Sequence, residues 1–327
     1  MRRSLLQVIC VKTLMLVLVS LSVLASEQVL PGSPVKLPES EVRHSFLAID
    51  ESRSQMIHVD QNDSSRDWTI QFPARYRDCQ LIGGNKVLVS TGEGYREYSL
   101  DTRQMLKDVK GFRGIMFARR RVDGSTVIGG NVKDGVEITE LDPQDKTARK
   151  ASFASGGTRL GRLTSQGTVL FGSGERLMEV ALDGRIVKDF KVDGCKWMYQ
   201  ALRRADGHLL AAGGYSFDFV ELAADGKVIK RFGGKDATEA KALGYHFFGG
   251  FQVLKNGNVV VANWTGHGAQ DSNKGAQLLE FNPEGKLVWA WHDPKMAGSI
   301  NGVIVLDDIN ISVLNDDISG ILGPVTR

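Results

Sequence analysis

Two histidines, an asparagine and a tryptophan lie close together between positions 246 and 267, and their residue types could do chemistry. His246 precedes a β-rich run, and Asn263, Trp264 and His267 follow the next β-rich run. A histidine can serve as a general acid or base near neutral pH, or as a metal ligand. A tryptophan can stack against the apolar face of a ring. We therefore treat this segment as the candidate site.

The same segment predicts a β-hairpin that brings these side chains to one end. Apolar residues alternate with others over 251–253 and 259–261, and Asn256-Gly257 lies between the two runs. Asn-Gly flanked by β-rich runs is the strongest short signal for a hairpin. Because His246 precedes the first strand and 263–267 follow the second, the candidate side chains should meet at the open end.

Degraded copies of this hairpin recur along the chain with a period of about 40 residues and four strands per unit. Each unit places a Gly-rich connection after its second strand, and several units close with a strand that begins at Lys or Arg. This pattern is typical of a β-propeller blade. Units of this kind begin near Arg77, Gly114, Thr158, Lys196 and Tyr245.

The two ends of the chain supply the remaining blade. Residues 45–72 provide three strands without a first strand, and Asn301–Leu306 provides a first strand. Combining them closes the ring and removes exposed sheet edges. We therefore predict an all-β fold: a six-bladed β-propeller with four antiparallel strands per blade, forming a single domain over 45–327. The alternative is seven blades, if Ile311–Asn315 forms a further second strand.

The start of the chain predicts export. Arg2-Arg3 forms a basic region, Leu14–Leu24 is apolar, and Ala25 suits a cleavage site, so 1–25 is expected to be a signal peptide. An uncleaved anchor is the alternative. Residues 26–44 are then a linker. We expect an exported protein, periplasmic or secreted, with no integral membrane span after cleavage.

Charge and cysteine content narrow the possible partners. The formal net charge is +3, and the predicted leader carries three positive charges (Arg2, Arg3 and Lys12) and no acid, so the rest of the chain is balanced. This balance argues against nucleic acid as a partner. Cys79 and Cys195 lie about three repeats apart. We expect them to be free and buried, and the protein to be a monomer.

In a propeller, the loops that lead into the first strands lie on the same face as the loops that join second and third strands. The loop 265–275 is expanded and Gly-rich, which is typical of functional loops on a rigid scaffold. Other blades should bring cationic and aromatic residues to the same face: Arg77, Arg113, Arg159, Trp197, Tyr199 and Tyr215. Such a basin suits an anionic or sugar-like ligand, since Arg binds carboxylate, sulfate or phosphate and aromatic rings stack.

Three interpretations of the candidate site remain open. His246 and His267 could be catalytic, or they could join Asp271 in a site for a divalent metal. A ligand could instead be bound without chemistry by Asn263, Trp264, Arg113, Arg159, Trp197 and Tyr199. Finally, His246 could be a packing residue and His267 a solvated loop residue. The identity of any cofactor is not given by the sequence.

A glutamate recurs at one register of the repeat. The members of this set are Glu97, Glu140, Glu179, Glu221 and Glu280. Because they occupy equivalent positions, we expect one repeated structural role, such as contact with the neighbouring blade or its turn, rather than a carboxylate ring.

The stretch from His246 to His267, with Gln277–Trp291, resembles an uncharacterised group of exported bacterial β-propellers. These are grouped loosely with quinoprotein-like (PQQ-like) and arylsulfotransferase-like propellers. The resemblance extends over the chain after the leader and implies the propeller fold and export. The arylsulfotransferase comparison implies a catalytic histidine with Arg and Asn neighbours, roles that His246, Arg113, Arg159 and Asn263 could fill.

The quinoprotein comparison implies a docking motif that ends in Gly, a few residues and then Trp. Gly285–Trp289 fits this motif, and Trp68 matches it in part. The equivalent strands elsewhere end in Phe190 and Phe232, and the vicinal cysteine pair of some quinone sites is absent. We therefore do not expect PQQ to be bound.

Together these features favour an exported propeller that binds a small or carbohydrate-like ligand at its rim, with an anionic ligand suited by the arginines. The first alternative is a His- or metal-dependent lyase, hydrolase or sulfotransferase at the same rim. The second is a protein-interaction scaffold.

Overall fold

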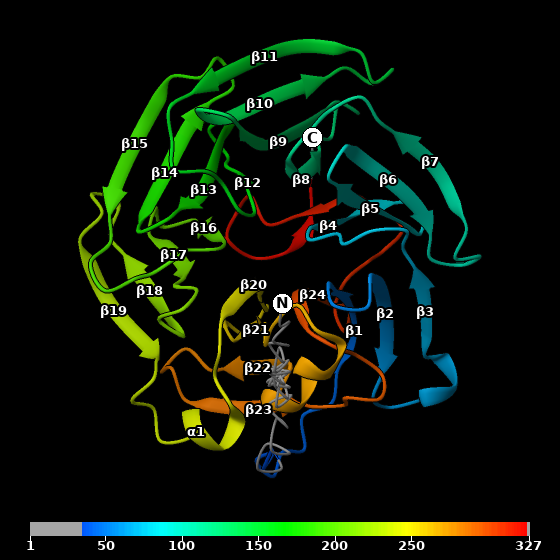
Figure 1. Cartoon of the computed structure of the whole chain (residues 1–327), viewed down its shortest axis with the longest axis vertical. Helices are drawn as coiled ribbons and strands as arrows, with labels where there is room; N and C mark the ends of the chain where they lie inside the picture. The colour runs from blue at the N-terminus through cyan, green and yellow to red at the C-terminus, as the bar shows by residue number, and fades with distance from the viewer. Residues whose placement is uncertain (1–34, 326–327) are drawn as a thin grey trace, which may run out of the picture.

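The computed structural model describes residues 35–325, which form six four-stranded antiparallel sheets arranged as a ring (Figure 1). The predicted signal peptide and the linker up to residue 34 lie outside the described residues. Within the described range, no helix is long and apolar enough to cross a membrane.

The strands of each sheet are given from the channel outward. The first sheet is β24 (Ile300–Val305), β1 (Ser45–Asp50), β2 (Gln55–Asp60) and β3 (Trp68–Gln71). The second is β4 (Cys79–Gly83), β5 (Lys86–Thr91), β6 (Gly94–Ser99) and β7 (Met105–Val109). The third is β8 (Ile115–Arg120), β9 (Thr126–Val132), β10 (Gly135–Leu141) and β11 (Thr147–Phe153).

The remaining sheets follow the same order. The fourth is β12 (Arg162–Leu163), β13 (Thr168–Ser173), β14 (Arg176–Ala181) and β15 (Ile186–Lys191). The fifth is β16 (Ala201–Arg203), β17 (Leu209–Ala212), β18 (Asp218–Leu222) and β19 (Val228–Gly233). The sixth is β20 (Phe248–Val253), β21 (Val259–Asn263), β22 (Leu278–Phe281) and β23 (Leu287–Trp291). The short helices are η1 (Ser64–Arg66), α1 (Ala240–Leu243) and η2 (Ala269–Lys274).

The ring closes as the sequence predicted. β24, near the end of the chain, pairs antiparallel with β1, with Phe46 opposite Val305 and Ala48 opposite Val303. Beyond β24, the strands within the described residues are β25 (Asn315–Asp316) and β26 (Gly323–Pro324), which pair with each other. The six-bladed prediction is confirmed and the seven-bladed alternative is wrong, because Ile311–Asn315 adds no blade strand.

Apolar side chains from neighbouring blades fill the spaces between sheets. Phe219 of the fifth blade packs against Phe248, Phe251 and Phe281 of the sixth, with ring centroids 5.1 to 6.2 Å apart. The inner strands β20 and β24 are buried along their whole length. The prediction that both later cysteines are free and buried is also confirmed.

An aromatic residue on the outermost strand of one blade packs against a turn of the next blade. A Cβ on Gly226 would lie 2.4 Å from the ring of Phe190, and a Cβ on Gly285 would lie 2.4 Å from Phe232. Both glycines have positive φ, 90° and 85°, in the turn between third and fourth strands. The phenylalanines at the expected docking position therefore join successive blades without the tryptophan of the quinoprotein motif.

Three of the five recurring glutamates join blades, so the single repeated role that the sequence predicts holds for only part of the set. Glu97 binds Arg120 of the next blade at 2.8 Å, and Glu179 pairs with Arg203 of the next blade. The equivalent residue of the sixth blade, Glu280, is 2.8 Å from His44, which precedes β1. The other two glutamates pair with arginines of their own blades, Arg121 and Arg204.

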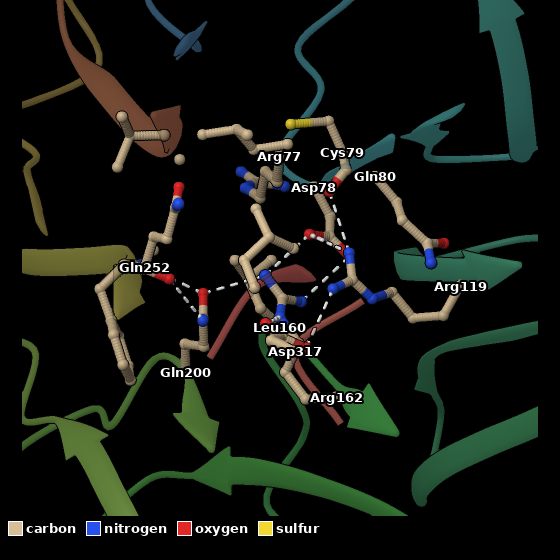
Figure 2. A pocket seen from close by; sticks show the side chains of 16 residues that line it. Arg77, Asp78, Cys79, Gln80, Arg119, Leu160, Arg162, Gln200, Gln252 and Asp317 are labelled. Atoms are coloured by element: carbon tan, nitrogen blue, oxygen red, sulfur yellow. Dashed lines mark hydrogen bonds and ion pairs between the residues drawn. The ribbon is translucent and has the colours of Figure 1, made fainter. Parts of the chain in front are cut away.

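The C-terminal segment lies across the centre of the ring (Figure 1). Asp317 lies 3.0 Å from Arg162 and 3.3 Å from Arg119, and all three side chains are buried (Figure 2). Asp78 completes the cluster at 3.1 Å from Arg162. Burial, together with the neighbouring Asp317 carboxylate, raises the pKa of Asp316 to about 8.

His44 joins three parts of the chain at the closure point. Its Nε2 lies 2.8 Å from Glu280, its Nδ1 lies 2.5 Å from Asp307, and the residue is 5% exposed. Burial alone lowers the pKa of His44, but hydrogen bonds and Coulombic attraction from Asp307 and Glu280 raise it to about 9. The imidazolium form therefore donates to both carboxylates.

We call His44 with Glu280 and Asp307 the closure latch. The raised pKa of His44 predicts that the free energy of unfolding falls as the pH rises. Because the folded-state pKa is above the unfolded value of about 6.5, the stabilisation is complete below that pH and is lost as the pH rises through about 9. We expect the free energy of unfolding to fall by about 3 kcal/mol between about pH 6 and pH 10, as measured by urea denaturation. His44→Gln should flatten this dependence, whereas His208→Gln should retain it. Equal slopes for His44→Gln and the wild type would contradict the latch.

Candidate functional site

A cavity of about 440 Å³ opens on the face of the ring where the inner strands begin, and we call it the rim cavity. Two kinds of segment supply its walls. Arg77, Arg159 and Tyr199 precede the inner strands of three blades. Tyr215 and the pair Trp264 and His267 come from loops between second and third strands. The propeller thus brings both loop types together, as its geometry requires.

Glu51 is the centre of the polar wall. It is 2% exposed, and its Oε1 accepts a hydrogen bond from Arg77 at 2.6 Å. Its Oε2 accepts a hydrogen bond from the indole Nε1 of Trp264 at 2.9 Å and lies 3.5 Å from Nδ1 of His267. The carboxylate therefore neutralises Arg77, fixes the indole and faces the histidine ring.

The lining also contains aromatic side chains and a second guanidinium. The guanidinium of Arg159 lies over the ring of Trp197, 5.2 Å from the centroid, a cation–π arrangement. Trp197 is 43% exposed and has a φ of 65°, an uncommon backbone conformation for a bulky residue. Tyr215 meets Phe247 edge to face at 4.7 Å. Burial raises the pKa of Tyr199, so its hydroxyl stays neutral.

Five of the predicted catalytic or ligand-binding residues line the rim cavity. These are Arg159, Trp197, Tyr199, Trp264 and His267. Arg77 and Tyr215, which were expected on the same face, also line it. Arg113 does not: it is exposed and lies outside the lining.

Asn263 is buried, does not line the cavity, and hydrogen-bonds only to backbone groups. Its Oδ1 accepts from the N–H groups of His246 and Phe247 at 2.8 and 3.3 Å. Its Nδ2 donates to the carbonyls of Gly244 and Ala276 at 3.0 and 2.8 Å. The amide therefore fixes the loops that carry the rim residues and has no group left for a ligand.

His246 also lies behind the cavity wall. Its Nδ1 is 3.1 Å from the carbonyl oxygen of Trp264, and its ring meets the indole at a centroid distance of 5.9 Å. Burial lowers the pKa of His246, which favours the neutral ring. The structure thus separates the two predicted catalytic histidines: His267 faces the cavity, and His246 supports it.

The predicted metal ligands do not converge. Asp271 binds Lys274 at 2.8 Å and accepts a hydrogen bond from the N–H of Gly268 at 2.9 Å. Among residues 35–325, no group of three or more His, Cys, Asp or Glu side chains is arranged to hold a metal ion. His246, His267 and Asp271 are therefore not assembled as a metal site in this structure.

The sequence prediction missed four lining residues: Glu51, Met116, Phe247 and Asn301. A signal was present for two of them. Glu51 follows the strand that had been assigned as the second strand of the closing blade, so it belongs to the same loop class as Trp264. Asn301 had been placed at the start of the first strand of that blade. Both positions could have been assigned to the rim by the repeat alone.

No family model matches the chain, and no curated protein matches it in sequence. A protein of unknown function from Bacteroides caccae is 19% identical over 82% of this chain and 100% of its own, with a TM-score of 0.68. A streptogramin B lyase is 11% identical over 81% of this chain and 85% of its own, with a TM-score of 0.54. At these identities the comparisons support the β-propeller fold alone.

A third similar structure is virginiamycin B lyase from Staphylococcus aureus. It is a catalytically inactive histidine-to-alanine variant with quinupristin, 9% identical over 80% of this chain and 90% of its own, with a TM-score of 0.54. None of these three is described as a quinoprotein or an arylsulfotransferase. Those two resemblances stay predictions.

The role of Asn263 predicts a loss of stability on substitution. Asn263→Ala removes four hydrogen bonds from a site that is 0% exposed and leaves their backbone partners unsatisfied. We expect the free energy of unfolding to fall by about 2–4 kcal/mol in urea denaturation. Asn273→Ala, at an exposed position in η2, should change it by less than about 0.5 kcal/mol. Equal stabilities for the two variants would assign Asn263 no structural role.

Proposed function

We propose that the rim cavity binds a small anionic compound that contains a ring. One observation carries the proposal: the two guanidiniums of the cavity differ in their pairing. Arg77 is paired with Glu51 at 2.6 Å. Within residues 35–325, Arg159 forms no ion pair, and its Nη1 makes only a 3.4 Å contact with the carbonyl of Thr158. A half-buried guanidinium without a carboxylate partner favours an anionic ligand.

The rest of the wall suits a ring. Trp197 and Tyr215 are exposed toward solvent, and Phe247 and Trp264 are buried in an apolar cluster with Leu160 and Tyr199. A volume of about 440 Å³ lies within the range of small-molecule sites. This concave, charged and aromatic surface favours a small ligand over a protein-docking scaffold. The predicted leader would place the binding site outside the cytoplasm, which is part of the proposal.

Substitution of Arg159 should test the proposal. We expect calorimetric titration with ring-containing acids, such as benzoate and D-glucuronate, to detect binding of at least one acid but not of its neutral counterpart. Arg159→Met should weaken that binding by about 10- to 100-fold, because a charge-assisted hydrogen bond contributes about 1.5–3 kcal/mol.

Arg113→Met is the matched control, since Arg113 is exposed on the same face but does not line the cavity. Its affinity should stay within about twofold of the wild type. If Arg159→Met binds as tightly as Arg113→Met, the cavity is not an anion site.

Catalysis at the same cavity is a second candidate function. It is favoured by the Glu51–His267 pair, in which a buried carboxylate faces Nδ1 of an exposed histidine at 3.5 Å. With Nδ1 oriented by Glu51, Nε2 is the ring nitrogen available as a base. Two of the similar propellers are described as lyases, one of them inactivated by loss of a histidine.

A lyase step is consistent with this arrangement. His267 would take a proton from the carbon next to the ligand carboxylate, while Arg159 stabilises the charge that develops on the carboxylate. The electron pair of the broken C–H bond would form a carbon–carbon double bond, and the leaving group would depart with the pair of its own bond. The step needs no oxidant or reductant.

Substitution of His267 should lower the turnover rate without weakening ligand binding. We expect His267→Gln to lower kcat by at least about 100-fold, since loss of a general base removes roughly 10²–10⁴ in rate. Ligand affinity should change by less than about threefold, and His208→Gln should keep full activity. A His267→Gln variant with wild-type kcat would leave the cavity a binding site without chemistry.

A further inference from the structure

One polar side chain of the rim cavity has no partner in the folded protein. Asn301 lines the cavity and is only 2% exposed. Neither Oδ1 nor Nδ2 of its amide makes a hydrogen bond with any described residue. Buried amides are almost always paired, because an unmet donor or acceptor is costly. Asn301 therefore needs a functional explanation.

The local backbone explains how Asn301 reaches this position. Asp50 pairs with Ile300 and Ile49 pairs with Gly302, so Asn301 is the extra residue of a β-bulge. A bulge re-aims a side chain and is common beside functional sites. The neighbouring glycine pair leaves room for the bulged backbone, since Cβ atoms on Gly249 and Gly250 would lie 3.1 and 2.9 Å from the carbonyl oxygen of Asn301.

A second β-bulge lies near the start of another inner strand, β8, and directs an apolar side chain instead of an amide. In β8, Ile115 pairs with Gly130 and Phe117 with Gly129, so Met116 is the extra residue. Met116 also lines the rim cavity. Two inner strands thus use the same irregularity to direct a side chain to the cavity, one apolar and one an amide.

The chemistry of an unpaired carboxamide limits what it can recognise. It presents an acceptor and donors in one plane, so it is matched by a group that offers both, such as two neighbouring hydroxyls. Arg159 adds a position for an acid, and the aromatic wall adds stacking against a ring face. The ligand that satisfies all three groups is an acidic sugar.

We propose that the rim cavity takes a uronate-type sugar and that Asn301 selects it by hydrogen bonds to its vicinal hydroxyls. This inference depends on the proposed function, in which the cavity binds an anionic ring compound. It adds the chemical class of the ligand and the residue that determines specificity.

Two probes and two variants test the selection. D-Glucuronate carries the acid and the vicinal hydroxyls, whereas benzoate carries the acid and a ring without hydroxyls. In calorimetric titration, Asn301→Leu should weaken D-glucuronate binding at least about tenfold and leave benzoate binding within about twofold. Its Tm should equal or exceed that of the wild type, because an unpaired buried amide is replaced by an apolar group of similar size.

Met116→Leu is the matched control at the other bulge, and it should leave the ratio of the two affinities unchanged. If Asn301→Leu does not fold, Asn301→Ala answers the same question: a tenfold loss of D-glucuronate affinity supports the inference, and no loss overturns it.

The outcomes for the wild type separate this inference from the proposed function. If the wild type binds benzoate but not D-glucuronate, the inference is wrong and the anion site stands. If it binds neither probe, both proposals fail. If it binds D-glucuronate and Asn301→Leu binds it equally well, the sugar class stands but Asn301 is not the selecting residue, and the inference is overturned.

Discussion

The antiparallel pairing of β24 with β1 is the contact on which the rim cavity depends. It places Glu51, from the start of the described chain, beside Trp264 and His267 of the sixth blade, so that one hydrogen bond joins residues 213 positions apart. It also creates the bulge that carries Asn301. Without closure, the carboxylate would lie at the opposite end of an open sheet array from the indole and the carboxamide. The site is therefore a property of the closed ring and of no single blade.

Inside the ring, the charged cluster of Arg119, Arg162, Asp78 and Asp317 has a different role. Buried ion pairs add little net stability, because the cost of removing charges from water offsets their attraction. They do penalise alternative arrangements, since a misplaced segment would leave a charge buried and unpaired. Asp317 comes from the C-terminal segment, so the cluster fixes where that segment crosses the channel (Figure 2). Gln80 also donates hydrogen bonds to the carbonyl of Asn315 and to Asp316, so charge and hydrogen bonds together hold this segment.

The repeat carried most of the information that could be predicted. Blade number, ring closure and the face occupied by Arg159, Trp197, Tyr199, Trp264 and His267 follow from strand order, because strand order determines which loops share a face. The direction in which each side chain points could not be predicted from strand order. Asn263 and Trp264 are adjacent, yet one amide is used up by four backbone groups and the other side chain reaches the cavity. Periodicity cannot separate them, because the strand ends there and the alternation of faces ends with it. Glu51 was missed because its partners are distant in sequence, although its loop class was already known.

The lining residues of the rim cavity differ in how exposed their side chains are, and this difference bears on both proposals. Glu51, whose carboxylate is paired, and Asn301, whose amide is not, are both almost fully buried, whereas Trp197, Tyr215 and His267 are exposed. Arg159 is half-buried. The hydroxyl-bearing edge of an acidic sugar would be desolvated only where Asn301 offers replacement hydrogen bonds, while its carboxylate stayed near Arg159. Because an acid without hydroxyls has nothing to offer Asn301, discrimination follows from the hydrogen bonds that only the sugar makes with this amide.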